Sequence, residues 1–568
     1  MADGQGGARD QLGPVSDPDD LLIVGGRIFI AGTSEHPPAE VPDAIAVRAG
    51  RIAWIGRLND GLRDWRGPRT KIIEGRGGLV TPGFDDAHIH VREGANELER
   101  VDLFRLDSLA AVQAAIAAHG AADPAAPWVL GKGWLYMAFP GGMPDRRQLD
   151  AVIPDRPAFM GCFDGHTGWA NTAALRLAGI DRETLDPPDG VIVRDPITGE
   201  ATGALKEGAQ DLVTRHIPRP TTASTLDAMR RTIGALHAAG ITAIQEAWAE
   251  PEDVPLWRTL RDEGALRIRA RLALPMRPGG TLEEWGATLD GYEDLAGDLR
   301  GGEWLDAGIL KAFADGVIEA RTAAMLEPYV GDTSTGRPEW SADDLDAFVA
   351  EADRRGWQVE IHAIGDGGIR MALDTYERAA VTNPGRDPDR RHRVEHIEAI
   401  AASDITRFAK LGVVASMQPY HADPSPNQAD VWSANIGPER AGRAWSWGSI
   451  RRAGGVLAFG SDWPVVPFDP IIALNSAVNR QTIDGYPREG WHPSERLSIP
   501  EALAAYGHGS AYAAFADGRR GTLRVGADAD LAVLDRDILD EGPSSIIGTT
   551  VALTVVGGQV VHRSEALS

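Results

Sequence analysis

The pattern of hydrophobic positions differs between the two ends of the chain and its middle. Near both ends, short runs of β-type residues are broken by glycine-containing turns, at residues 20–30, 44–56, 529–537 and 551–563. Alternation of this kind around Gly-Gly and Ala-Gly is typical of β-hairpins. Because the two ends resemble each other, we expect them to pair into one small, discontinuous β-sandwich.

The middle of the chain changes period. Strand-like apolar runs alternate there with amphipathic helices, which favours parallel βα units in an α/β fold. The clearest unit is a helix from about Thr225 that stops at Gly240 and is followed by an apolar strand. Eight strands are predicted, at residues 79–90, 241–247, 267–274, 308–313, 358–366, 392–400, 413–420 and 456–465. Eight parallel strands are what a (β/α)₈ (TIM) barrel requires.

These patterns divide the chain into parts. We predict a disordered lead-in over 1–19, a β-sandwich from 20–80 and 515–568, and a barrel over 81–514. Residues 105–220 or so are more than the barrel needs, and they are rich in proline, glycine and tryptophan. This stretch leaves the end of the first strand, where barrel active sites lie, so we interpret it as a lid or substrate-pocket insertion.

Composition and charge narrow the function classes. The chain has 568 residues, a formal net charge of -25 and one cysteine, Cys162. The acidity argues against nucleic acid as a partner, and one cysteine excludes an intramolecular disulfide and a thiolate-rich metal cage. No apolar run reaches the roughly 18 residues of a membrane helix, and the N-terminus does not resemble a secretory signal. We expect a cytoplasmic protein with a small-molecule substrate and no membrane partner. A homo-oligomer is compatible with its large acidic barrel.

Six residues suited to metal binding or acid–base chemistry fall at or near the C-terminal ends of predicted strands. Two histidines close the first strand in the sequence HIH, and side chains two residues apart on a strand point to the same face. The others lie on strands four, five, six and eight. The set is His88, His90, Lys311, His362, His396 and Asp462. Each residue alone is more often a satisfied core residue than a ligand. Together, however, they would converge on the active-site face of the barrel.

Imidazole nitrogens with a carboxylate suit zinc, and a catalytic zinc site keeps one position open for water. A bound divalent metal lowers the pKa of that water to about 7. Asp462 fits two roles, as metal ligand and as carrier of the proton to the leaving group, and we assign it with His396 as catalytic. Lys311 would repel a metal as an ammonium, but carbamylated by CO₂ it would bridge two. The prediction is one or two divalent ions, with zinc favoured.

Several longer motifs resemble the amidohydrolase superfamily. They are HIH, DGHTGWANTAAL, TGALKEGA, LKAFADGVIEARTAAMLEPY, EIHAIGDGGI, RVEHIEAI and FGSDWPVVPFDP. Within the superfamily they are similar to the YtcJ-like (amidohydrolase 3) branch, which includes the N-substituted formamide deformylases. The resemblance implies a (β/α)₈ barrel flanked by a β-sandwich. It also implies one or two metals bound by the residues at the six positions above, with Lys311 as the bridging member.

Further polar residues are candidates for substrate binding. Glu246 ends the second strand and suits either a metal or a hydrogen bond from a ligand histidine. Glu207 and His166 lie in the insertion, where His166 suits a substrate hydrogen bond or a structural turn. Arg321 would hold a substrate carboxylate or pair with Asp315, and we favour the pair.

Tryptophans gather in the segments predicted for the catalytic face. They are Trp134, Trp169, Trp248, Trp432 and Trp463. Aromatic walls with a few polar groups are typical of small-molecule pockets, so we predict an apolar or aromatic substituent on the substrate. The alternative is that these rings only pack the lid against the barrel.

The sequence therefore favours a metal-dependent hydrolase of a carbon–nitrogen bond, an amide or an N-substituted formamide. A deaminase, or a hydrolase of cyclic amides or lactones, would use the same site. A non-catalytic barrel that serves as a scaffold is the alternative from another class, and it would be marked by missing ligands.

Overall fold

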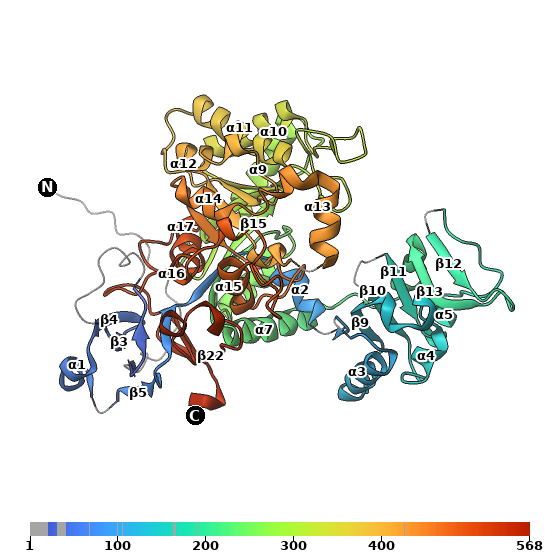
Figure 1. Ribbon diagram of the computed structural model, residues 1–568, viewed down its shortest axis with the longest axis horizontal. Helices are drawn as coiled ribbons and strands as arrows, with labels where there is room; N and C mark the ends of the chain where they lie inside the picture. The colour runs from blue at the N-terminus through green and yellow to red at the C-terminus, as the bar shows by residue number, and fades with distance from the viewer. Residues whose placement is uncertain are drawn as a thin grey trace. The chain divides into compact units, whose positions relative to one another are not determined.

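The computed structural model describes residues 21–30, 41–67, 69–98, 100–104, 106–162, 166–188, 190–424 and 426–567 (Figure 1). The predicted lead-in, 1–19, lies outside the described residues. The described chain divides into two compact units. The first is built from the residues up to Val91 together with Ile233–Ser568, and the second is Arg92–Thr232.

The first unit contains an eight-stranded sheet in which every neighbouring pair is parallel. Its strands in chain order are β7 (Phe84–Ile89), β14 (Ile241–Glu246), β15 (Arg269–Pro275), β16 (Leu305–Phe313), β17 (Gln358–Ala363), β18 (Arg393–His396), β19 (Val414–Met417) and β20 (Leu457–Phe459). The first and last strands meet just beyond β20, where Asp462 N donates to His88 O at 2.6 Å. The predicted eight-stranded barrel is confirmed, with each strand inside or overlapping its predicted range.

The barrel strands are buried along their whole length, except that Asp306 and Phe313 of β16 are partly exposed. Every residue of β14, β15 and β17 is buried, which is usual for parallel strands covered on both faces. Helices connect them: α7 (Thr222–Ala238), α8 (Val254–Asp262), α9 (Leu282–Ala296), α10 (Ala342–Arg354), α11 (Asp366–Thr382), α12 (Arg407–Leu411), α13 (Pro426–Ala441), α14 (Trp447–Arg452), α15 (Pro470–Asn479), α16 (Ile499–Ala504) and α17 (Ser510–Ala513). The polar residues on these buried strands therefore require internal partners.

Two smaller sheets of the first unit form the β-sandwich predicted from the chain ends. One contains β1 (Leu21–Val24), β3 (Ala44–Arg48), β4 (Arg51–Gly56) and β5 (Lys71–Glu74). The other contains β2 (Arg27–Ile28), β6 (Leu79–Pro82), β21 (Leu531–Leu534), β22 (Val551–Val556) and β23 (Gln559–Arg563). Figure 1 shows β22 of the C-terminal part near the N-terminal strands. Helices α1 (Leu58–Trp65) and α18 (Ile538–Glu541) complete these segments.

The two ends of the chain share one apolar core in this sandwich. Ile23 and Ile45 from the N-terminal part belong to the same buried cluster as Leu531 and Val555 from the C-terminal part. Strand β6 pairs with β21 in antiparallel register, and only Gly83 separates β6 from barrel strand β7. The sandwich is thus joined directly to the strand that carries the HIH sequence.

The second unit has its own sheet and core. Its strands are β8 (Val101–Asp102), β9 (Val129–Trp134), β10 (Ala158–Cys162), β11 (Thr167–Ala170), β12 (Gly190–Arg194) and β13 (Ala201–Glu207). Its helices include α3 (Leu109–Ala122), α4 (Arg146–Asp150), α5 (Thr172–Leu177) and α6 (Asp211–Thr214), and α2 (Val91–Glu97) lies at its start. The predicted insertion, 105–220, falls inside this unit, and its role as a lid stays a prediction.

No helix among the described residues combines the length and the apolar character that crossing a membrane requires.

Candidate metal centre

The barrel brings the residues of the HIH sequence together with those of four other strands. His88 lies on β7, Lys311 on β16, His362 on β17 and His396 at the end of β18. These four side chains and Asp462 are buried, each with 8% or less of the residue exposed. His90, one residue beyond β7, is partly buried. The C-terminal end of the barrel is therefore lined by the predicted set.

Asp462 lies at the centre of the histidines. Its Oδ1 is 3.4 Å from His88 Nε2 and 3.1 Å from His90 Nε2. Its Oδ2 is 4.0 Å from His396 Nδ1 and 3.5 Å from His421 Nε2. One buried carboxylate thus faces nitrogens supplied by four histidines.

The imidazole rings also contact one another. The ring centroids of His88 and His396 are 4.9 Å apart, and those of His362 and His396 are 4.4 Å apart. His90 lies 5.5 Å from His88. All four predicted histidines therefore belong to one cluster, together with Asp462.

Two of the central residues have a left-handed backbone. The φ angle is 72° at His396 and 61° at Asp462, a region that non-glycine residues seldom adopt. The left-handed conformation costs about 1–2 kcal/mol per residue, and such strain is concentrated at functional sites. At His396 it also ends the alternation of strand β18, so that consecutive side chains, Glu395 and His396, both turn toward the cluster.

Burial sets the protonation of the cluster. It lowers the pKa of His362 to about 3 and that of His396 well below the ordinary value, so both rings are neutral and suited to metal ligation. Burial would raise the pKa of Asp462, but hydrogen bonds from His88 and His90 outweigh it and hold that pKa well below the usual range. The site thus combines neutral nitrogens with an ionised carboxylate.

These donors fit a divalent metal. Ligand atoms of His88, His396 and Asp462 lie within 4.8 Å of one another. His396 Nδ1 is buried and, within the described part of the chain, has no hydrogen-bond partner. A buried nitrogen without a partner is costly unless it binds something, and imidazole with carboxylate is a ligand set for zinc and related ions.

Lys311 is buried beside the cluster. Its Nζ is 5.2 Å from the centre of the Phe313 ring. Burial lowers its pKa from the ordinary value, although Glu360, Glu395 and Asp462 act in the opposite direction. A lowered pKa increases the fraction of Lys311 in the neutral amine form, which is the form that reacts with CO₂. Carbamylation of Lys311 stays a prediction.

Four residues of this region were missed from the sequence: Glu360, Glu395, Glu398 and His421. Glu395 Oε2 is 2.6 Å from His88 Nδ1, and Glu398 Oε1 is 3.8 Å from His421 Nδ1. Both glutamates flank His396 in RVEHIE, and that spacing was an available signal. His421 follows the predicted seventh strand by one residue, in a turn over Pro419–Ala422.

Two other predicted residues of the first unit are Glu246 and Trp463. Glu246 is fully buried and lies in register with Ile89, between the two histidines of HIH. Trp463 is buried, follows Asp462 directly, and its carbonyl accepts a hydrogen bond from His90 N at 2.8 Å. Both residues therefore lie at the same end of the barrel as the cluster, and their substrate roles stay predictions.

The favoured pair of Arg321 with Asp315 is wrong. Arg321 donates to Asn435 Oδ1 at 2.9 Å and pairs with Asp332 at 3.5 Å. Asp315 instead accepts from the backbone N–H groups of Ala324, Ile364 and Gly365. The carboxylate oxygens of Asp315 are thus occupied by backbone N–H groups of neighbouring loops and do not bind the Arg321 guanidinium.

Four of the predicted residues lie in the second unit. His166 Nδ1 is 3.1 Å from Glu207 Oε2, and both side chains are exposed. Trp134 and Trp169 are fully buried, where their indole N–H groups donate to Met160 O and Asp145 O. Both indoles pack around Phe139 in the core of this unit. The contribution of these four residues to substrate binding stays a prediction.

A buried nitrogen–carboxylate cluster at the C-terminal end of a (β/α)₈ barrel defines a class of metal-binding barrel proteins. The particular family follows from comparison with known proteins. The chain belongs to the Amidohydrolase family, whose model matches residues 71–562.

Three relatives cover nearly the whole chain. Protein LONG AFTER FAR-RED 3 of Arabidopsis thaliana is 32% identical over 96% of this chain and 91% of its own length. The putative amidohydrolase YtcJ of Bacillus subtilis (strain 168) is 29% identical over 92% and 96%, respectively. N-substituted formamide deformylase of Arthrobacter pascens is 28% identical over 95% and 97%. The resemblance inferred from the motifs is confirmed.

Among solved structures, an uncharacterized metal-dependent hydrolase from Pyrococcus furiosus has a TM-score of 0.70 and 26% sequence identity. The match covers 92% of this chain and 100% of that one. Family membership together with the cluster supports a metal-dependent hydrolase.

Proposed function

We propose that the protein hydrolyses a carbon–nitrogen bond, an amide or an N-substituted formamide, in a small molecule with an apolar or aromatic substituent. The observation that carries the proposal is the buried carboxylate of Asp462 between the nitrogens of His88, His90, His396 and His421. This arrangement lies where barrel enzymes place their chemistry.

His88, His90, His362, His396 and Asp462 are the residues that would hold a divalent cation, with zinc favoured. Such an ion, when bound, supplies Lewis acidity toward a carbonyl oxygen and toward water. Asp462 takes the proton of the attacking water and passes it to the departing nitrogen, which must leave as an amine. The low pKa of its carboxyl keeps Asp462 ionised, the form that can accept a proton.

Two observations support the substrate class. One relative at 28% identity is named for deformylation of N-substituted formamides. In addition, an aromatic run begins at the site: Phe313 lies 4.9 Å from His362 and 5.3 Å from Trp248, measured between ring centroids. Trp248 is only partly buried, so this run offers an apolar surface beside the polar cluster.

Metal analysis and a substrate panel test the proposal. We expect one or two divalent ions per purified chain, and faster hydrolysis of N-alkyl or N-aryl formamides than of the matching formate esters. Absence of stoichiometric metal after reconstitution with zinc or manganese would favour the scaffold alternative. Preference for esters, or release of ammonia from ring amidines, would replace the amide assignment by one of the other reactions.

The number of metals depends on Lys311, which we propose as a carbamylated bridge. Lys311→Ala should lose activity that short-chain carboxylic acids partly restore, and the wild-type protein should contain close to two ions per chain. A single ion, with no rescue of the variant, would assign Lys311 to substrate binding or to support of the ligands.

A further inference from the structure

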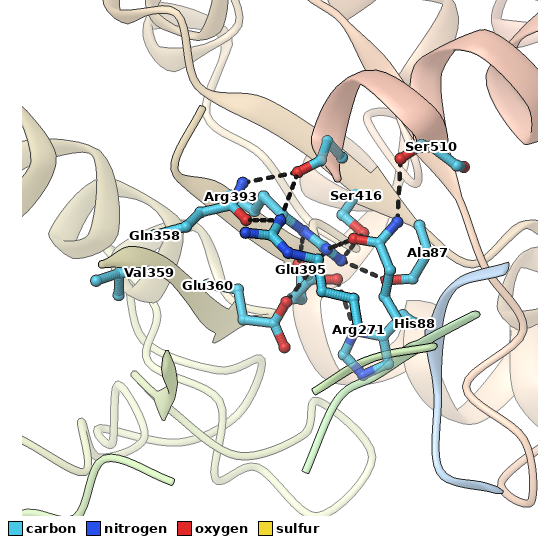
Figure 2. A network of polar contacts seen from close by, with 12 residues as sticks. Ala87, His88, Arg271, Gln358, Val359, Glu360, Arg393, Glu395, Ser416 and Ser510 are labelled. Carbon is cyan, nitrogen blue, oxygen red and sulfur yellow. Dashed lines mark hydrogen bonds and ion pairs between the residues drawn. The ribbon is translucent and has the colours of Figure 1, made fainter. Parts of the chain in front are cut away.

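A fully buried arginine lies inside the barrel beneath the histidine cluster. Arg393, on β18, has no exposed surface, and its guanidinium is surrounded by acceptors (Figure 2). Its partners are Glu395 Oε1 at 2.8 Å, Gln245 Oε1 at 2.5 Å, the Ala87 carbonyl at 2.5 Å, Ser416 Oγ at 3.0 Å and Glu360 Oε2 at 3.3 Å. So many fixed partners hold the guanidinium in a single orientation.

Glu395 connects this arginine to the cluster. Its Oε1 accepts from Arg393 Nε, and its Oε2 lies 2.6 Å from His88 Nδ1. Both carboxylate oxygens are thereby committed, and Glu395 is fully buried. The contact to Nδ1 leaves His88 Nε2 as the nitrogen on the side of Asp462, at 3.4 Å.

The same carboxylates could in principle form a second metal site, because His88, Glu360 and Glu395 offer ligand atoms within 4.8 Å of one another. The guanidinium of Arg393, however, contacts both glutamates, at 3.3 Å and 2.8 Å. A fixed cation already balances their charge, so a further metal ion there would meet direct repulsion. Glu395 is therefore better explained as support for His88 than as a metal ligand, and Glu360 as a further partner of Arg393.

We propose that Arg393 and Glu395 are positioning residues for the metal site. Arg393 fixes Glu395, and Glu395 fixes the ring orientation of His88 by accepting a hydrogen bond from its Nδ1, which leaves Nε2 as the nitrogen available to a metal. The proposal rests on the proposed metal-dependent function. A carboxylate behind a ligand histidine orients the ring and strengthens its bond to metal.

Glu395→Gln tests the proposal, and Glu360→Gln is its matched control. Both changes replace a buried carboxylate in contact with Arg393 by an amide of the same shape, but only Glu395 has a hydrogen bond to His88. The readouts are the zinc dissociation constant of the metal-free protein, from competition with a chelator, and the visible absorption spectrum of the cobalt-substituted protein. Neither depends on turnover.

We expect Glu395→Gln to weaken zinc binding by about 10–100-fold and to alter the cobalt spectrum. Glu360→Gln should change zinc binding by less than about threefold, within the spread of ordinary additive effects. Glu395→Asp, which keeps the charge but shortens the side chain, should give an intermediate loss, and it serves if the glutamine variant does not fold.

The order of these interactions, from Arg393 through Glu395 to His88, gives a second test. Arg393→Lys should weaken zinc binding in the wild-type background but add nothing once Glu395 is replaced by glutamine, because its effect passes through that carboxylate. Equal losses for Glu395→Gln and Glu360→Gln, or a wild-type zinc constant in Glu395→Gln, overturn the positioning role while leaving the metal site intact. A wild-type protein that binds no metal overturns both this proposal and the proposed function.

Discussion

The two ends of the barrel differ in how their buried charged side chains are paired. At the N-terminal end, arginines are closely paired with carboxylates: Arg269 with Asp530 at 2.6 Å, and Arg271 with Asp306 at 2.6 Å. At the C-terminal end, Asp462 faces four histidines at 3.1 to 4.0 Å, and His396 Nδ1 has no hydrogen-bond partner within the described chain. The buried arginines at one end have carboxylate partners, whereas the other end leaves a buried histidine nitrogen without a hydrogen bond.

The presence of a cavity alone would direct attention to the other end of the barrel. A cavity of about 430 Å³ lies at the N-terminal end, lined among others by Arg269, Arg271 and Asp306. Since its buried arginines already have carboxylate partners, it offers little for a ligand. Unsatisfied donors and strained backbone identify the functional end better than empty volume does.

Removal of the central carboxylate should give the largest effect in the molecule. Asp462→Asn should lower turnover by about 10³-fold or more, because the amide cannot accept the proton from water. Circular dichroism and thermal unfolding of the metal-free variant should match the wild type. Activity close to wild type would remove Asp462 from the proton transfer.

A change at the opposite end should affect stability instead. Asp530→Asn leaves Arg269 without its closest carboxylate in a place where both side chains are about 3% exposed. Breaking a buried pair of this kind costs about 3–5 kcal/mol, measurable by urea unfolding. Turnover per folded molecule should be unchanged, and a variant that loses turnover without losing stability would contradict the contrast between the ends.

The pH dependence of the free energy of unfolding should test the N-terminal end of the barrel as well. Hydrogen bonds from His392 and Asn383, together with the Arg390 guanidinium, outweigh burial and lower the pKa of Asp353 to about 2. A depressed carboxyl pKa stabilises the fold above the ordinary value of 3.8, and this contribution is lost as pH falls toward about 2. In Asp353→Asn, the free energy of unfolding should be lower at pH 7 and should fall less steeply between these pH values. An unchanged acid slope would show that Asp353 is not the group responsible.

An exposed ion pair should contribute least to the stability of the fold. Arg258 and Asp298 are 2.6 Å apart, yet the Asp298 side chain is 61% exposed. Asp298→Asn should cost less than about 1 kcal/mol, because water and salt screen such pairs. A cost equal to that of Asp530→Asn would mean that burial does not distinguish these ion pairs.

The sequence predicted the barrel strands and the central residues because both depend on local periodicity and on the end of each strand. It did not reveal Glu395, since strict alternation would place Glu395 and His396 on opposite faces. The positive φ of His396 interrupts that alternation, and the residue types in this segment did not indicate such a φ angle. The partners of Asp315 were missed for another reason. Its carboxylate oxygens accept hydrogen bonds from the backbone N–H groups of Ala324 and Ile364, which follow it by 9 and 49 residues in the chain.

The pairing of β6 with β21 has a consequence for synthesis of the protein on the ribosome. Val80 lies opposite Val533, so the strand leading into the HIH sequence lacks this neighbour until the chain has been translated as far as Val533. The ribosome releases residues in order, and a strand edge without its partner is prone to mispairing. The strand that leads into the metal centre thus gains this partner late in translation, and its edge is open to mispairing until then.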